Sequence, residues 1–180
     1  MKRKEIDFDD LYTRASHLWR SQWLLLTSGD FEKNDFNTMT VGWGSLGYMW
    51  GKPFAQVVVR PTRHTFSFME KYGTFTLTAF PEEQHEALML LGTKSGRDGD
   101  KITEAGLTPT ASHNIPAPGF DEAELIIECK TCYWDDFDPD KFMAPEIDKH
   151  YPEKDYHRIY FGEILTVLGD EKFDFSCDGI

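Results

Sequence analysis

Residues 60–65 (Arg-Pro-Thr-Arg-His-Thr) bring two guanidinium groups and two hydroxyl groups into one short segment. A β-branched run precedes this segment, and a predicted helix follows it. The first turn of a helix offers unpaired N–H groups and a partial positive charge, which together suit an anion. Arg60, Arg63 and the threonines add donors that match phosphate oxygens. The segment therefore predicts an anion site, unless both arginines are solvated or paired with surface carboxylates.

A second candidate anion loop is the polar segment 95–101. Gly96 and Gly99 let backbone N–H groups approach a ligand closely, and Ser95 and Lys101 add side-chain donors. The segment lacks the Gly-Lys-Ser/Thr of a Walker loop, and the chain contains no Gly-x-Gly-x-x-Gly. Taken by itself, the segment is more typical of an ordinary polar turn.

Residues 37–44 are candidates for the wall of a site that holds a flat ring. Strand alternation puts Thr38 and Thr40 on one face and Met39 and Val41 on the other, so a planar heterocycle would find polar and apolar partners. The alternative, which the local pattern favours, is a strand that enters a glycine-rich turn with Trp43 in the core.

No other residues predict a metal site or a catalytic acid, base or nucleophile. Cys129 and Cys132 form a Cys-x-x-Cys string without a second pair, and on a strand their sulfurs point to opposite faces. The histidines show no metal-ligand spacing, and Gly-x-Ser-x-Gly is absent. His157 ends a surface excursion and is placed to reach over a pocket, although a solvated loop histidine is the more common outcome.

Hydrophobic periodicity and turn residues predict the elements that position these groups. Helices are expected at 9–19, at 62–72 with Thr62 as N-cap and Gly73 as the stop, from 81 to a stop at Gly92, and in a short segment closed by Gly106. Strands are expected at 23–28, 54–59, 124–134, 158–168 and, half-buried, at 74–80, with an excursion over 135–157. Strands outnumber helices without regular alternation, which disfavours a doubly wound parallel sheet. We expect a single domain over residues 1–180, mainly β with peripheral helices.

Composition limits the partners. The chain has 180 residues and a formal net charge of −12, which disfavours nucleic acid and anionic membranes because phosphate-rich surfaces attract Lys and Arg. Three cysteines do not indicate a disulfide framework, and no apolar run approaches membrane-spanning length. The first residues lead into acids rather than an apolar signal core, so we expect a cytoplasmic protein.

Four segments in this order, 37–43, 60–65, 95–101 and 157–164, resemble the flavin reductase-like family of FMN-binding split β-barrels, flavoredoxin-like members included. The resemblance covers about residues 19–168 and implies a homodimer with flavin near the interface. It implies that Arg60, Arg63 and Thr65 hold the FMN phosphate, with help from Ser95, Gly96 and Lys101. Asn37, Met39, Thr40 and Trp43 would line the ring and ribityl region, and His157 would lie near the flavin on the nicotinamide or substrate side.

The same resemblance implies an NAD(P)H:flavin oxidoreductase in which hydride passes from NADH or NADPH through the flavin. The long excursion before His157 departs from the family pattern and puts a free nicotinamide donor in question. Two alternatives stay open. The first is a flavoredoxin-type electron carrier reduced by a redox protein, which the acidic surface suits. The second is a non-enzymatic barrel that binds another phosphorylated ligand.

Overall fold

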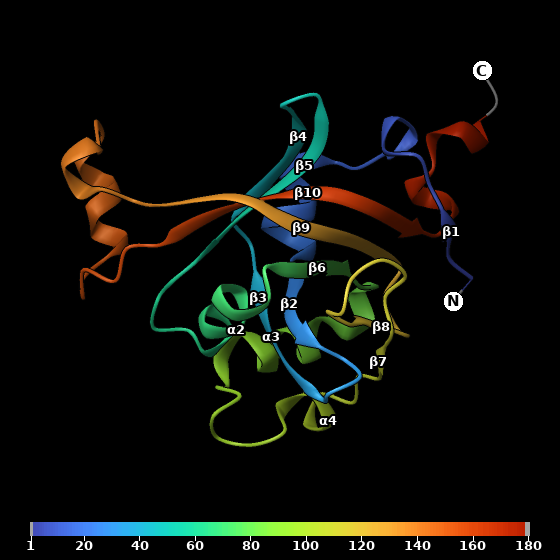
Figure 1. The fold of residues 1–180 in the computed structure, drawn as a ribbon, viewed down its shortest axis with the longest axis horizontal. Helices are drawn as coiled ribbons and strands as arrows, with labels where there is room; N and C mark the ends of the chain where they lie inside the picture. The colour runs from blue at the N-terminus through green and yellow to red at the C-terminus, as the bar shows by residue number, and fades with distance from the viewer. Residues whose placement is uncertain (1, 179–180) are drawn as a thin grey trace.

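The computed structural model describes residues 2–178, and most of its strands form one antiparallel sheet. The strands are β1 (Lys4–Glu5), β2 (Leu24–Asp30), β3 (Asp35–Val41), β4 (Gly44–Met49), β5 (Lys52–Val59), β6 (Thr74–Ala79), β9 (Leu125–Asp136) and β10 (Arg158–Gly169), with β7 (Pro109–Thr110) and β8 (Gly119–Phe120) as a separate pair. The order in the sheet is β3-β2-β6-β9-β10-β5-β4, and β1 pairs with β10 outside this path (Figure 1).

The two edge strands of this sheet are joined by two residues only, Gly42 and Trp43. Because β3 and β4 lie at opposite ends of the strand order, so short a connection requires the sheet to curl until its edges meet. No ladder pairs β3 with β4 in the part of the chain that the structure describes, so the barrel is open along this seam. The predicted mainly β, split-barrel fold is confirmed.

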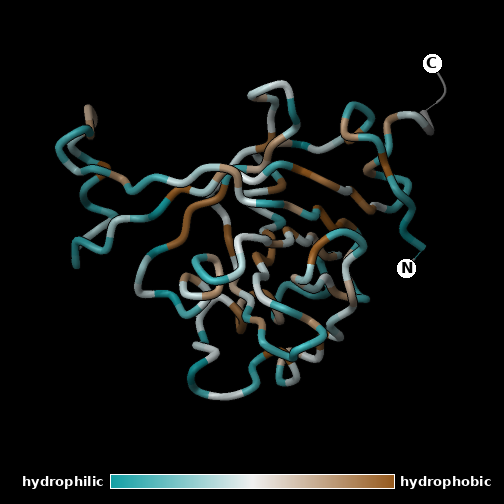
Figure 2. Tube along the Cα trace, viewed as in Figure 1, coloured by the Kyte–Doolittle hydropathy of each residue, from teal (hydrophilic) through white to brown (hydrophobic). Residues whose placement is uncertain are grey.

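The core has two parts, one inside the curled sheet and one between the sheet and the helices α3 (His85–Thr93) and α4 (Lys101–Glu104). Figure 2 shows the hydrophobic residues along the central strands. The strand predicted at residues 74–80 is observed as β6, but the expectation that it is half-buried is wrong, because its outer face is also covered. Thr76 and Thr78 are fully buried, and the Thr76 hydroxyl donates to the carbonyl of Pro118 at 2.7 Å.

Helices pack on both faces of the sheet, since Met69 belongs to the hydrophobic cluster inside the curled sheet, and Leu88 and Leu91 belong to the cluster outside it. The helices are α1 (Ala15–His17), α2 (His64–Tyr72), α3 (His85–Thr93) and α4 (Lys101–Glu104), with a π-helical turn at Leu18–Gln22 and short 3₁₀ turns at Phe8–Asp10, Glu82–Gln84, Pro139–Lys141, Pro145–His150, Glu171–Phe173 and Phe175–Asp178. α2 packs on β2 and β3, and α3 packs on β3. Gly73 ends α2 as predicted, with φ +62° and its N–H donating to the Met69 carbonyl. No helix in the described residues is long and apolar enough to cross a membrane.

Three predicted helix boundaries are wrong. Residues 9–19 do not form one helix, because Leu11 forms a β-bridge with Asp174 and this pairing draws the chain into an extended path. The N-cap of α2 is Arg63 rather than Thr62. Gly92 lies inside the last turn of α3 rather than after it, since the helix needs a small residue against Thr40 there.

Residues 137–157, between β9 and β10, project beyond the end of the sheet (Figure 1), and we call them the wall segment. β9 runs two residues further than predicted, to Asp136, so the excursion is slightly shorter than expected. Tyr151 is its best-buried side chain, with 1% of its surface exposed.

Candidate functional site

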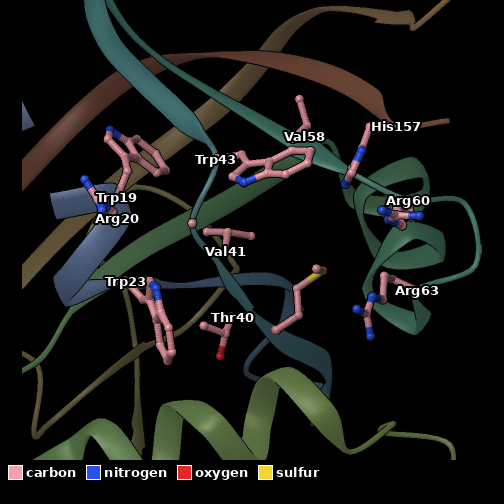
Figure 3. Close-up of a pocket in the computed structure, with 12 residues that line it drawn as sticks. Trp19, Arg20, Trp23, Thr40, Val41, Trp43, Val58, Arg60, Arg63 and His157 are labelled. Carbon is pink, nitrogen blue, oxygen red and sulfur yellow. The ribbon is translucent and has the colours of Figure 1, made fainter. Parts of the chain in front are cut away.

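Two adjoining cavities lie where the seam, the start of α2 and the start of β10 converge. The large cavity has a volume of about 490 Å³ (Figure 3) and the small cavity about 140 Å³. The large cavity is lined by Trp19, Arg20, Trp23, Met39, Thr40, Val41, Gly42, Trp43, Val58, Arg60, Arg63 and His157. The small cavity is lined by Asn37, Met39, Thr62, Arg63, His64, Thr65, Leu91, Gly92, Thr93, Lys94, Ser95, Gly96, Arg97 and Lys101. Met39 and Arg63 line both, and every one of the predicted site residues lies on one cavity or the other.

The floor of the large cavity comes from β3 and the seam. Met39 and Thr40 reach it from consecutive positions of the strand, and the Thr40 hydroxyl donates to the carbonyl of Leu88 in α3. Trp43 follows the strand and is 47% exposed, so the alternative that buries this residue in the core is wrong. Its indole instead forms part of the cavity wall (Figure 3).

Sequence reasoning missed Trp19, Arg20 and Trp23, which enter the large cavity from the π-helical turn. Trp23 ends this turn with φ +58° and ψ +162°, a backbone conformation that costs a residue other than glycine about 1–3 kcal/mol. Its indole stacks on His85 at 4.5 Å. The strained backbone and the stack together hold a flat surface against the cavity, and no local sequence signal predicts a π-helical turn.

The small cavity lies at the start of α2. Arg63 is the N-cap and makes no side-chain capping bond, so the first N–H groups of the helix have no side-chain acceptor. The Asn37 amide donates to the Thr65 hydroxyl at 2.7 Å, which fixes β3 to this first turn. Both side chains are buried. They position the helix start, which carries a partial positive charge.

Three cations border the small cavity without an acidic partner. Within the described residues, Arg63, Arg97 and Lys101 form no ion pair, whereas Arg60 and Arg158 are both paired with carboxylates. Lys101 is buried and donates to the carbonyls of Leu91 and Lys94 at 2.8 and 3.0 Å, near the end of α3.

Burial and, to a smaller extent, the neighbouring positive charges lower the pKa values of two groups beside this cavity. Burial, together with the Arg63 guanidinium, lowers the pKa of Lys101 to about 8. Burial also lowers the pKa of His64, and the charges of Arg97 and Lys101 lower it further. The His64 Nδ1 atom is buried and has no hydrogen-bond partner among the described residues. The cavity therefore favours an anion.

Arg60 is oriented differently from Arg63. It lines the large cavity only, and its guanidinium pairs with Asp155 of the wall segment at 2.5 Å. It also donates to the carbonyl of His150 at 2.8 Å and lies over the ring of Tyr151. The arginine that borders the small cavity is thus Arg63.

His157 lies at the start of β10, 9% exposed, with its ring 5.2 Å from that of Trp43. Burial and the Arg60 guanidinium lower the pKa of His157 to about 4, so its imidazole is neutral at pH 7. Its Nδ1 atom is 2.8 Å from the hydroxyl of Tyr151.

The described residues contain no group of three or more His, Cys, Asp or Glu side chains arranged to hold a metal ion. Cys129 is buried in the core and Cys132 is exposed, so their sulfurs diverge as predicted.

The model of the flavin reductase-like domain family matches residues 20–175 of the chain. An uncharacterized protein of Pyrococcus abyssi is 25% identical over 142 residues, which are 77% of this chain and 69% of that protein. Among solved structures, the FMN-binding domain of a flavin reductases-like enzyme from Shewanella baltica superposes with a TM-score of 0.68 and 16% identity, over 94% of this chain and 78% of that one. Flavoredoxin of Desulfovibrio vulgaris superposes with a TM-score of 0.65 and 20% identity, over 89% of this chain and 75% of that one. At these identities the structures share the fold.

Proposed function

The chain belongs to the family of flavin reductase-like domains, and we propose that it binds FMN, with the phosphate in the small cavity and the ring in the large one. One observation carries this proposal. Arg63, Arg97 and Lys101, unpaired with acids in the described residues, surround a 140 Å³ cavity at an uncapped helix start. In a chain with a net charge of −12, such a group of cations is explained by an anionic ligand.

The donor set fits this cofactor. The backbone of Gly96 lies close against Asn37, as a loop that wraps a phosphate requires, and the unpartnered Nδ1 of His64 is a further polar atom near the small cavity. The large cavity offers the indoles of Trp19, Trp23 and Trp43 to a flat ring, in a volume typical of cofactor sites.

We further propose an oxidoreductase that takes electrons from NADH or NADPH. FMN supplies the two-electron chemistry when it is bound. The protein then has to bind and orient the ring and exclude water, which Met39, Thr40 and the three tryptophans do from fixed elements. No side chain has to act as nucleophile or general base.

An electron carrier of the flavoredoxin kind is the second candidate, and the wall segment favours it. Its His150 ring lies 5.5 Å from Trp43, and Arg60 holds the segment beside the large cavity, which limits the space for a nicotinamide over the ring. The acidic chain suits docking onto a basic redox protein. Stopped-flow reduction by NADH and NADPH separates the two functions. Negligible reduction by both, with fast reduction by a redox protein, identifies the carrier.

We also propose a homodimer. Aromatic side chains gather on the outer face of β4, β5, β9 and β10, where the Trp50 ring lies about 6 Å from those of Tyr133 and Phe161. Trp50 and Tyr133 on this face are 61% and 45% exposed. An exposed aromatic group of this kind is typical of an interface between subunits.

The experiment that tests FMN binding compares ligands with and without a phosphate. We expect purified protein to show the visible absorption of flavin, and Arg63→Ala to weaken FMN by about 1–3 kcal/mol, the cost of a lost charged hydrogen bond. Riboflavin, which lacks the phosphate, serves as the control and should respond much less. Colourless protein that gives no signal with free FMN contradicts the proposal. Unchanged FMN affinity in Arg63→Ala indicates that the cations hold another phosphorylated ligand.

A further inference from the structure

We propose that Tyr151 of the wall segment is a positioning residue that fixes His157 as a hydrogen-bond donor into the large cavity. The acceptor is an oxygen or nitrogen atom of a flat ring bound there, so this inference rests on the proposed function. Four features of the structure support it: the pairing of the two side chains, the direction of the proton they share, the orientation of the imidazole and the anchoring of the wall segment.

The two side chains form a closed pair. The Tyr151 hydroxyl lies 2.8 Å from His157 Nδ1, and the residues are 1% and 9% exposed. Water has little access to either group, so each must satisfy the other.

The direction of the proton between them follows from the partners available. The structure gives the Tyr151 hydroxyl one partner among the described residues, which is His157 Nδ1. A buried hydroxyl proton needs an acceptor, so the hydroxyl donates and Nδ1 accepts. A neutral imidazole that accepts at Nδ1 carries its own proton on Nε2.

Burial and the nearby charges keep the imidazole of His157 neutral. Arg60 and Arg63 face it from the end of β5 and the start of α2 and oppose protonation, while Asp155 of the wall segment favours it. Burial opposes the charged form more strongly than Asp155 supports it, which is why the pKa of His157 is lowered.

The imidazole points into the large cavity. Figure 3 shows the far edge of the His157 ring directed between Trp43 and Arg60. Because Nδ1 is engaged with Tyr151, the Nε2–H on this edge is the donor that remains for a ligand.

Arg60 anchors the wall segment and thereby Tyr151. Its guanidinium pairs with Asp155, donates to the carbonyl of His150 and lies 5.0 Å from the Tyr151 ring centre. Through these three contacts, one guanidinium group fixes the Tyr151 ring and a residue on either side of it in the sequence. The wall segment thus determines which ring nitrogen of His157 carries the proton.

The test uses ¹⁵N-histidine NMR of flavin-free protein, which distinguishes the two neutral forms of His157. We expect the wild type to hold the proton on Nε2. Tyr151→Phe should lose this preference and raise the pKa of His157, because the hydroxyl stabilises the neutral ring. Tyr156→Phe is the matched control, since Tyr156 packs 4.9 Å from Tyr151 but donates to Asp148 instead. A wild-type proton on Nδ1, or an unchanged form in Tyr151→Phe, overturns the proposal.

Ligand addition identifies the acceptor. A shift of the His157 Nε2 signal with FMN assigns it to the flavin, and a shift that needs a nicotinamide as well assigns it to the donor molecule. We expect one of these molecules to shift the signal. Tyr151→Phe should raise the Kd for that molecule by about three- to tenfold, the effect of losing one hydrogen bond. If FMN binds, as its visible spectrum reports, and neither molecule shifts the signal, the donor role is wrong while the proposed function stands. If FMN does not bind, the proposed function fails, and the donor role fails with it.

Discussion

The side-chain oxygen of Asn37 lies 2.1 Å from the position that a Cβ atom on residue 96 would occupy. The loop between α3 and α4 can approach β3 this closely only because residue 96 is glycine. Gly96→Ala must displace either the loop or the Asn37 side chain, which donates to Thr65, at a cost of about 1–3 kcal/mol. We expect the Kd for FMN to rise about tenfold or more, measured by quenching of flavin fluorescence.

Gly99→Ala, in the same loop, is the control for Gly96→Ala. A Cβ at Gly99 meets no atom within 4 Å, although its φ of +140° strains any other residue. Equal loss of FMN affinity in both variants means that loop strain, rather than the approach to Asn37, governs the site.

The hydroxyl of Thr65 stabilises the fold as well as the helix start. Thr65→Val removes the acceptor of the Asn37 amide and leaves a buried donor unpaired, which costs about 1–3 kcal/mol. Urea unfolding of flavin-free protein measures this loss. Thr74→Val is the matched control, because the Thr74 hydroxyl is buried without a partner in the described residues and its removal loses no hydrogen bond.

Lys101 makes FMN affinity depend on pH. Its pKa of about 8 in the free protein lies below the usual 10.5, and a bound phosphate favours the charged form and raises the pKa again. Affinity should therefore be highest below pH 8 and fall as the pH rises, by up to about tenfold per pH unit. Calorimetric titration on both sides of pH 8 checks this, with riboflavin as the ligand that lacks phosphate. An FMN affinity that is flat over this range contradicts the prediction.

The same pKa predicts how stability changes with pH. From pH 8 up to 10.5, the unfolded chain keeps a proton that the folded Lys101 has lost. The free energy of unfolding of flavin-free protein should therefore rise through this window. Lys101→Met should remove that part of the rise, as urea unfolding at several pH values would show. The same slope in both proteins would mean that another group is responsible.

The aromatic face of the sheet gives a test of the dimer. Trp50→Asp places a charge on this face and should convert a dimer to a monomer in analytical ultracentrifugation. Met143→Asp is the control, because Met143 is 94% exposed and lies on the wall segment. A monomeric wild type, or a Trp50→Asp variant that stays dimeric, excludes an interface on this face.

The sequence predicts the strands better than the site because strands follow local patterns. The ends of β9 and β10 lie within two residues of their expected positions. The junction at Arg63 was predictable because a run of β-branched residues gives way there to hydrophobic residues at helical spacing. The partners of each arginine depend on the wall segment instead. Arg60 and Arg63 look alike in the sequence, yet Asp155, which lies 95 residues further along the chain, engages only the first of them.

Trp19 and Trp23 were not predictable as cavity residues, for a related reason. The period of residues 8–18 predicts a continuous helix, but pairing of Leu11 with Asp174 interrupts it and leaves a π-helical turn. That turn carries Trp19 and Trp23 into the cavity. A contact with the far end of the chain thus decides which rings a ligand meets.

The seam at Gly42 and Trp43 determines how a ligand reaches the large cavity. β3 and β4 share no ladder in the described residues, so their separation breaks side-chain contacts and leaves the hydrogen bonds of the sheet intact. Local openings that preserve backbone hydrogen bonds have low free energies and are fast compared with global unfolding. A ring held at this seam can therefore enter and leave while the barrel stays folded.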